Sequence, residues 1–254
     1  MGCLSALLAA VCAISTTTRF DVGDYAVVLM PSRSIVVPTV TFEGRTFSLA
    51  YRTDGWLLDG MEKVDYHSEQ TNRLAVLKGT AKGVRADYVH SLYAGSGGDR
   101  RLVGVCSNEV VFADGVVGVR TTLIPAEPGR YRFYAPYRAH QSVAFAQYEK
   151  EWVGTTLYMA ESKEHSFMNE LTPHDGFDPK AWGMNVNDIG YMREMELGNV
   201  PGVVRFKGDG CTKFSVNRYK GGFSAAAVLV NEDVMHKPAW DKPVSFSYAV
   251  SMEK

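Results

Sequence analysis

The chain has 254 residues, of which 46% are hydrophobic and 11% are aromatic. Its 27 basic and 28 acidic side chains give a formal net charge of −1, so bulk charge does not favour nucleic acid as a partner. This composition excludes a disordered, collagen-like or coiled-coil chain, and the length is sufficient to bury a core without disulfides.

A short apolar segment opens the chain. Residues 3–14 (CLSALLAAVCAI) are apolar except for Ser5, and the first charge is Arg19. This is the length of the hydrophobic region of a signal peptide and too short to span a bilayer. We expect a signal peptide over residues 1–15, export to the periplasm or exterior, and no membrane span. Because no Lys or Arg precedes the apolar run, a buried N-terminal strand or helix is the alternative.

The cysteines and short motifs indicate neither a metal nor a cofactor. Cys106 and Cys211 lie beyond the leader and form either one disulfide or two buried free thiols. The sequence contains no Cys-x-x-Cys pair, phosphate-binding glycine loop, His-Glu-x-x-His helix or Gly-x-Ser-x-Gly elbow. We therefore expect no metal site and no cofactor.

Alternation of apolar and polar residues is the dominant pattern along the chain. It predicts strands over residues 117–123, 130–134 and 244–252, where every second residue is apolar or aromatic except at Thr121. Turn residues at Glu43-Gly44 and Asp114-Gly115 indicate hairpins. Only residues 68–78 (SEQTNRLAVLK) suggest a short helix.

Many short strands separated by turns are typical of a sandwich or barrel. The sequence contains no internal repeat and no linker that would divide it. We therefore predict an all-β fold, a large antiparallel β-sandwich with few short helices, forming a single domain over residues 16–254.

The region from Glu161 to Gly198 is the first candidate site, because long irregular excursions in a compact β domain are usually functional or disordered. It contains histidines beside carboxylates, which supply acids and bases near neutral pH, and an aromatic ring on which a sugar can stack. The candidates are His165, His174 and Asp178 as catalytic residues and Trp182 as a substrate contact. The alternative is a well-packed loop with a buried Trp182.

A predicted strand face and one separate histidine provide further candidate substrate contacts. Arg130, Arg132 and Tyr134 are predicted to share one strand face, where two guanidinium groups could bind carboxylate or sulfate groups. The alternative is a solvated face with salt bridges to neighbouring strands. His90 alternates with apolar residues, which indicates either a core histidine or one that lines a concave sheet face.

Residues 25–49 (YAVVLMPSRSIVVPTVTFEGRTFSL) resemble the first strands of the galactose-mutarotase-like super-sandwich proteins, which include aldose epimerases. Residues 165–171 (HSFMNEL) resemble the catalytic histidine segment of the epimerases, and residues 176–182 (GFDPKAW) resemble a Trp-containing stretch that normally precedes it. The resemblance implies the super-sandwich architecture. It also implies a role for His165 as proton donor and for a late carboxylate such as Glu232 as base.

These patterns lead to two hypotheses about function. In the first, the protein is an exported carbohydrate-associated sandwich that binds or acts on a sugar or uronic acid by epimerase-like or lyase-like proton transfer. In the second, it is a non-catalytic binding or structural module of the cell envelope. Convergence of His and carboxylate groups in one place would favour the first hypothesis. The sequence specifies neither the sugar nor the oligomeric state.

Overall fold

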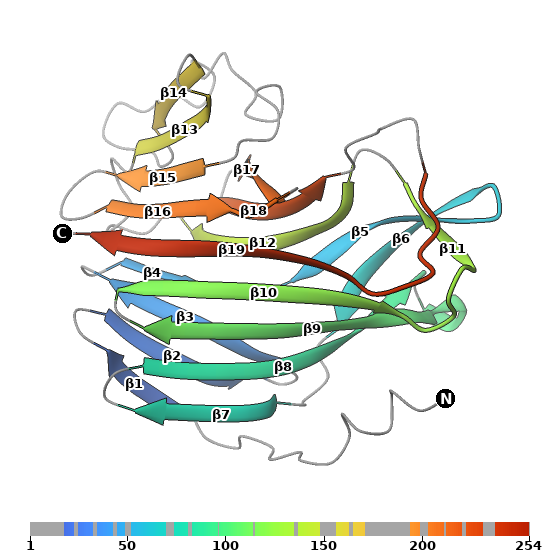
Figure 1. Cartoon of the computed structure of the whole chain (residues 1–254), viewed down its shortest axis with the longest axis horizontal. Coiled ribbons are helices and arrows are strands. Elements are labelled where there is room, and N and C mark those ends of the chain that lie inside the picture. Colours follow the sequence, from blue (N-terminus) through green and yellow to red (C-terminus); the bar gives the residue numbers. More distant parts are fainter. Residues whose placement is uncertain are drawn as a thin grey trace.

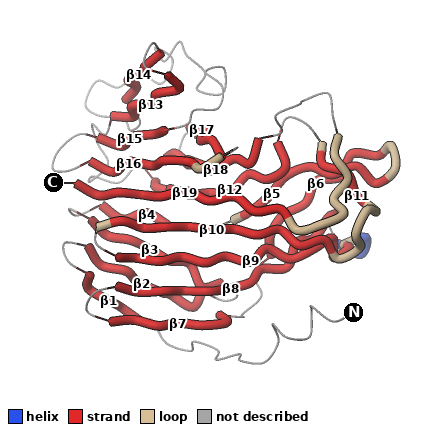
Figure 2. The backbone as a smooth tube through the Cα atoms, viewed as in Figure 1, coloured by secondary structure: helices blue, strands red, loops and turns tan. Residues whose placement is uncertain are grey.

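The computed structural model describes residues 18–22, 25–32, 35–42, 45–48, 52–69, 74–80, 83–95, 97–113, 115–134, 137–147, 156–162, 165–170, 194–198, 203–210, 212–219, 222–230 and 237–253. The predicted leader lies outside these ranges. The described residues are almost all in antiparallel strands, which confirms the all-β prediction (Figures 1 and 2).

The strands form two sheets. The smaller contains, in order, β1 (Thr18–Val22), β2 (Tyr25–Ser32), β3 (Ile35–Phe42) and β4 (Arg45–Ser48). The larger runs in the order β14 (His165–Glu170), β13 (Thr156–Ser162), β15 (Glu194–Gly198), β16 (Val203–Gly208), β19 (Val244–Glu253), β10 (Val116–Pro125), β9 (Arg101–Ala113), β8 (Gly83–Ala94), β6 (Glu62–Glu69), β5 (Thr53–Asp59), β12 (Tyr137–Gln147), β18 (Gly222–Val230) and β17 (Thr212–Tyr219). Two further strands pair beside this path, β11 (Tyr131–Phe133) with β5 and β7 (Leu74–Thr80) with β8.

The two sheets pack against each other. In Figure 1 the strands of the smaller sheet run behind β7 to β10, and β1 contacts β8 while β4 contacts β12. The described residues form an apolar core that includes Tyr88, Phe112, Phe133, Phe214 and Trp240, each at most 1% exposed. Burial of aromatic side chains of this size is a main source of stability for such a fold.

The predicted alternation is confirmed in the strands that carry it. In β19 the side chains of Phe246, Tyr248, Val250 and Met252 are buried, and in β11 Tyr131 and Phe133 are buried while Arg132 is exposed. Both predicted hairpins form, because Phe42 pairs with Arg45 and Ala113 pairs with Val116.

The helix predicted over residues 68–78 is wrong. Ser68 belongs to strand β6, and Leu74–Thr80 is strand β7, which pairs with β8 along its length. Hydrogen bonds to a neighbouring strand override the weak local preference for helix. Among the described residues the one helical segment is a 3-10 turn at Gly97–Asp99. No helix in those ranges is long and apolar enough to cross a membrane.

Candidate functional site

The strongest candidate site lies on one face of β5 and its neighbours. Along β5 Thr53, Gly55 and Leu57 are buried and Asp54 and Trp56 are partly exposed, so the even-numbered side chains point to the outer face, where Leu58 is itself largely covered. In antiparallel sheets, directly paired residues share a face. The outer face therefore carries three rows of side chains, which we call the outer strip: His140, Asp54 and His67; Tyr134, Trp56 and Asp65; Arg132, Leu58 and Lys63.

The first row places a carboxylate between two imidazoles. Asp54 pairs with His67 on β6 and with His140 on β12, and the His140 Nδ1 atom lies 3.5 Å from Asp54 Oδ1. The Arg52 Nε atom lies 3.2 Å from the other carboxylate oxygen of Asp54. On β6, His67 Nε2 is also 3.5 Å from the Glu69 carboxylate. Side chains that can accept and donate protons are thus neighbours on three strands.

Burial governs the electrostatics of this row. Desolvation raises the pKa of Asp54 above its ordinary value, against the opposing effects of His140, Arg52 and His67. Desolvation also lowers the pKa of His140, against the opposing effect of Asp54. The His140 imidazole is therefore neutral at pH 7, and the Asp54 carboxyl titrates closer to neutrality than an exposed one.

The second and third rows bring cations to aromatic rings. The Lys63 ammonium lies 3.9 Å from the centroid of the Trp56 ring and 5.2 Å from that of Tyr134. Lys237, from the segment that runs beside β11, places its ammonium 5.1 Å from the Tyr134 ring centroid. Arg132 Nε donates a hydrogen bond of 2.8 Å to the Lys237 carbonyl oxygen. Cation–π contacts thus hold both lysine side chains at these rings.

A polar network occupies the inner face of the same sheet. Gln141 Nε2 lies within hydrogen-bond distance of Thr53 Oγ1 (3.1 Å), Asn108 Oδ1 (3.0 Å) and Thr121 Oγ1 (2.9 Å). All four side chains are at most 1% exposed. Because no carboxylate takes part in these contacts and the residues are enclosed, this network is a structural element of the core.

His90 and Cys106 lie beside that network. His90 is 2% exposed, which confirms its predicted position among apolar residues, and burial lowers its pKa to about 4. Cys106 is a buried free thiol whose pKa is raised by desolvation to about 11. Of the two alternatives for Cys106, the structure therefore shows the free thiol. At 2% exposure, His90 is a core residue in this structure.

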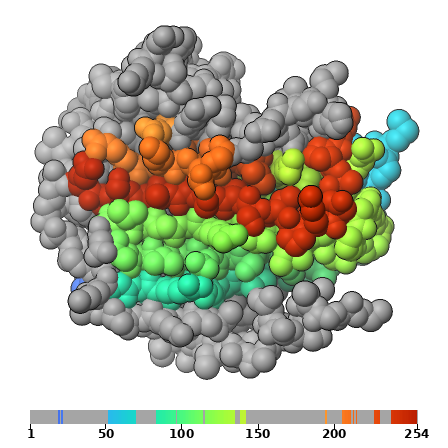
Figure 3. Space-filling model, viewed as in Figure 1, coloured from blue at the N-terminus to red at the C-terminus, as the bar shows by residue number. Residues whose placement is uncertain are grey.

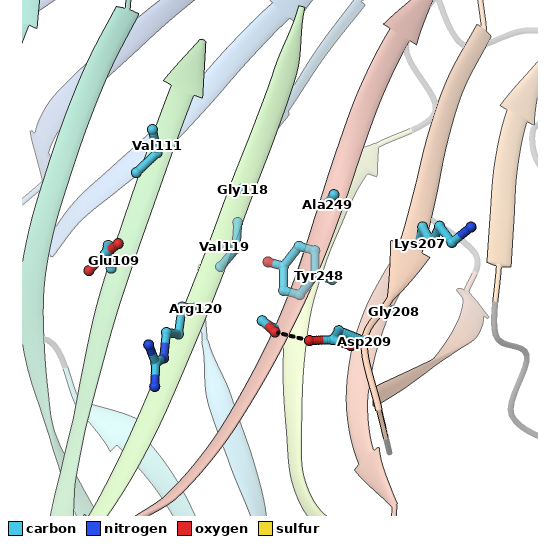
Figure 4. A pocket seen from close by; sticks show the side chains of 11 residues that line it. Glu109, Val111, Gly118, Val119, Arg120, Lys207, Gly208, Asp209, Tyr248 and Ala249 are labelled. Atoms are coloured by element: carbon cyan, nitrogen blue, oxygen red, sulfur yellow. Dashed lines mark hydrogen bonds between the residues drawn. The ribbon is translucent and has the colours of Figure 1, made fainter.

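A shallow groove lies over β9, β10, β19 and β16 (Figure 4), strands that lie side by side on the face seen in Figure 3. Its volume is about 440 Å³, its floor includes Gly118 and Ala249, and its rim carries charged side chains such as Lys207. Ser247 Oγ donates to Asp209 Oδ2 at 3.2 Å along one side. The described residues that line the groove include no histidine and none of the residues proposed from the sequence.

The predicted site residues are not all brought together. Arg132 and Tyr134 belong to the outer strip, but the Arg130 guanidinium forms ion pairs with Glu127 and Asp59, and Asp59 pairs with Tyr131 on the inner face. For Arg130 the structure therefore shows the salt-bridged alternative.

The three predicted catalytic residues differ in whether the structure describes them. His165 starts strand β14. The expectation of an irregular region over residues 161–198 is wrong for residues 165–170 and 194–198, which are strands paired with β13. His174, Asp178 and Trp182 lie outside the described residues, as do Glu232 and Cys211. Their roles remain predictions.

Sequence reasoning did not identify Asp54, Trp56, Lys63, His67 or His140. A signal was present, because residues 53–59 and 62–69 alternate and place Asp54 and Trp56 on one face. The pairing of β5 with β12, however, comes from the tertiary fold. Within the described ranges, no group of three or more His, Cys, Asp or Glu side chains is arranged to hold a metal ion.

No protein-family model matches the chain, and no curated protein matches its sequence. Solved structures do match its fold. An α-mannosidase from Enterococcus faecalis has a TM-score of 0.55 at 11% identity, over 92% of this chain and 29% of that one. An α-N-acetylgalactosaminidase from Bifidobacterium bifidum, in complex with GalNAc, has a TM-score of 0.50 at 11% identity, over 92% and 36%.

A third match is similar in length to this chain. It is a GalM/aldose epimerase homologue from C. elegans, with a TM-score of 0.50 at 8% identity, over 94% of this chain and 99% of that one. The chain thus spans only about a third of the length of the two glycosidases but nearly all of the epimerase homologue. The chain has a galactose-mutarotase-like fold, which confirms the architecture implied by the resemblance.

Proposed function

We propose that the outer strip binds a carbohydrate and that Asp54 and the neighbouring imidazoles exchange protons with it. The observation that carries this proposal is the Asp54–His140 pair, at 3.5 Å, beside the aromatic residues Trp56 and Tyr134 on the same face. Same-face residues on one strand are roughly 7 Å apart, about the width of a pyranose ring, so a sugar could reach both rows.

The chemistry of a reducing sugar suits this arrangement. Anomers interconvert when a base removes the proton of the C1 hydroxyl, the bond between C1 and the ring oxygen breaks, and an acid protonates that oxygen. The resulting aldehyde closes again after rotation about the C1–C2 bond, and the protons return. The Asp54 carboxylate is the proposed base, and His67, the more exposed of the two imidazoles, is the proposed proton donor.

The fold supports a sugar as the ligand. By their titles, the matching structures include a mannosidase, an N-acetylgalactosaminidase in complex with GalNAc and an aldose epimerase homologue. Transfer of a sugar ligand from those proteins to this chain is part of the proposal. Its location in the periplasm or exterior is also proposed, from the composition of residues 1–15. Sequencing the N-terminus of the cell-produced protein tests that location.

The predicted catalytic residues His165, His174 and Asp178 offer a second source of acid and base for the same ligand. Alanine variants at His165 and His174 separate the two assignments from each other. Loss of turnover in these variants, together with full turnover in Asp54→Asn, would assign the chemistry to His165 and His174 and reject the outer strip.

The proposal is tested by measuring anomer exchange with NMR magnetisation transfer on a panel of aldoses and uronic acids. Binding is followed in parallel by calorimetry. We expect Trp56→Ala to abolish binding. Val116→Ala is the control, because Val116 is an exposed apolar side chain on β10, a strand that does not border the strip. Wild-type protein that binds a sugar without exchanging its anomers would instead support the non-catalytic binding module. Absence of binding to every sugar would reject the proposal and favour a structural module.

A further inference from the structure

Cationic side chains surround the aromatic residues of the outer strip, and they differ from the other exposed cations of the protein. Most exposed arginines that the structure describes are neutralised by a carboxylate, as in the pairs Arg85–Asp87, Arg101–Asp59 and Arg130–Glu127. In contrast, Lys63, Lys237 and Arg132 have no carboxylate partner among the described residues. The one acidic side chain in their rows is Asp65, opposite Trp56. Among the described side chains of these rows and Lys237, cations therefore outnumber carboxylates.

The position of Lys63 determines what can approach Trp56. Its ammonium sits over the ring face at 3.9 Å, so the first group that a ligand meets there is a cation. A neutral sugar could stack on this face only after displacing the ammonium and losing its cation–π contact. A sugar that carries an anionic group could instead bind the ammonium where it stands and gain a charge-assisted hydrogen bond.

The other two cations lie on the same side of the site. Lys237 approaches the Tyr134 ring that Lys63 also approaches, and the Nε–H of Arg132 is bound to the Lys237 carbonyl oxygen. That hydrogen bond fixes the guanidinium beside the Lys237 backbone. None of the described residues accepts a hydrogen bond from its terminal amino groups, which can bind a planar anion with two parallel hydrogen bonds.

We infer that the ligand of the outer strip is an anionic sugar, whose carboxylate or sulfate group is held by Lys63, Lys237 and Arg132. This inference rests on the proposed function, since it names the class of sugar bound at the same site. The acidic group then lies at the cationic rows, and the sugar ring extends toward Asp54 and His67.

Calorimetric titration with a matched set of ligands tests this inference: glucose, glucuronic acid, glucose 6-sulfate and inorganic sulfate. We expect either acidic sugar to bind at least tenfold more tightly than glucose, and the preference for carboxylate or sulfate identifies the anion. Binding should weaken as salt is raised, because exposed charges are screened. Equal binding of glucose and both acidic sugars would overturn the inference and leave the proposed function intact. If inorganic sulfate bound as tightly as both acidic sugars, the site would recognise an anion and not a sugar, and this result would also overturn the inference.

Lys63→Met and Lys237→Met distinguish the charge of each lysine, which would bind the anionic group, from its apolar side chain, which packs on the aromatic ring. Methionine retains an apolar side chain of similar length and removes the charge. Each variant should weaken binding of the acidic sugar about three- to tenfold and leave glucose unchanged or improved. Lys207→Met is the matched control, because Lys207 is an exposed lysine far from the strip that pairs with Glu194. Variants that bind the acidic sugar like wild type would also overturn the inference, and circular dichroism verifies that each is folded.

Discussion

The His140 imidazole and the Asp54 carboxylate face each other across β12 and β5, with Nδ1 3.5 Å from Oδ1. Burial acts on both groups, since it raises the pKa of Asp54 and lowers that of His140. Each group therefore favours its uncharged form more than it would in water. A carboxyl whose pKa is raised in this way is suited to proton exchange with a bound substrate.

Asp54→Asn should abolish turnover while retaining binding. The amide has the shape of the carboxyl group but does not accept a proton, so we expect anomer exchange to fall by about 100-fold or more. Calorimetry should give a dissociation constant within about threefold of that of wild type. The matched control is Asp87→Asn, which removes a carboxylate paired with Arg85 on β8. Equal loss of turnover in both variants would contradict the assignment.

Protonation of His90 should destabilise the protein in acid. Its pKa is about 4 when folded, because the side chain is buried, and about 6.5 when unfolded. Between these values the unfolded chain binds more protons, so the contribution of His90 to stability is complete above pH 6.5 and is lost as the pH falls toward 4. The full loss is about 3 kcal/mol.

Urea unfolding at pH 7 and pH 4.5 measures this loss. His90→Leu should decline less in stability between the two pH values than wild type, because leucine does not titrate. Thr122→Val, at an exposed hydroxyl that does not titrate, is the control and should decline like wild type. A His90→Leu variant with the wild-type decline would show that other groups account for the acid sensitivity.

Gln141→Leu should lower the free energy of unfolding by about 2–4 kcal/mol. The substitution removes the shared partner of Thr53, Asn108 and Thr121 and leaves their polar atoms buried with fewer hydrogen bonds. Thr122→Val is the comparison, because its hydroxyl pairs with Ser245 at an exposed position and should cost less than about 0.5 kcal/mol. Equal effects in urea unfolding would show that the network does not stabilise the core.

Two glycines on neighbouring strands should respond differently to alanine. A Cβ atom at Gly104 would lie 2.5 Å from the Ile124 carbonyl oxygen and 2.5 Å from Cη2 of Trp240, so Gly104→Ala should destabilise the protein by about 1–3 kcal/mol. At Gly118, on the floor of the outer groove, nothing described lies within 4 Å of the added atom. Gly118→Ala should therefore be tolerated, and thermal unfolding of the two variants tests the contrast.

The local alternation of residues was sufficient to predict a strand and its buried face where the strand is half buried. Residues 244–252 alternate between apolar and small residues, and β19 buries the apolar set as expected. The same reasoning failed at residues 68–78, whose sequence is compatible with a helix but whose backbone groups pair with β8. The choice there depends on a neighbouring strand, which local propensity does not report.

The sequence by itself determined the strand periodicity, the turns and hence the all-β class, because these depend on residues that are close together in the chain. It also placed His90 among apolar residues, since strand alternation fixes the face of each side chain. Only the tertiary structure decided which strands are neighbours. The meeting of Asp54 with His140, and of Lys63 with Tyr134, requires β5 to pair with β6, β11 and β12 at particular registers. Those registers are set by packing of the whole sheet rather than by any local pattern.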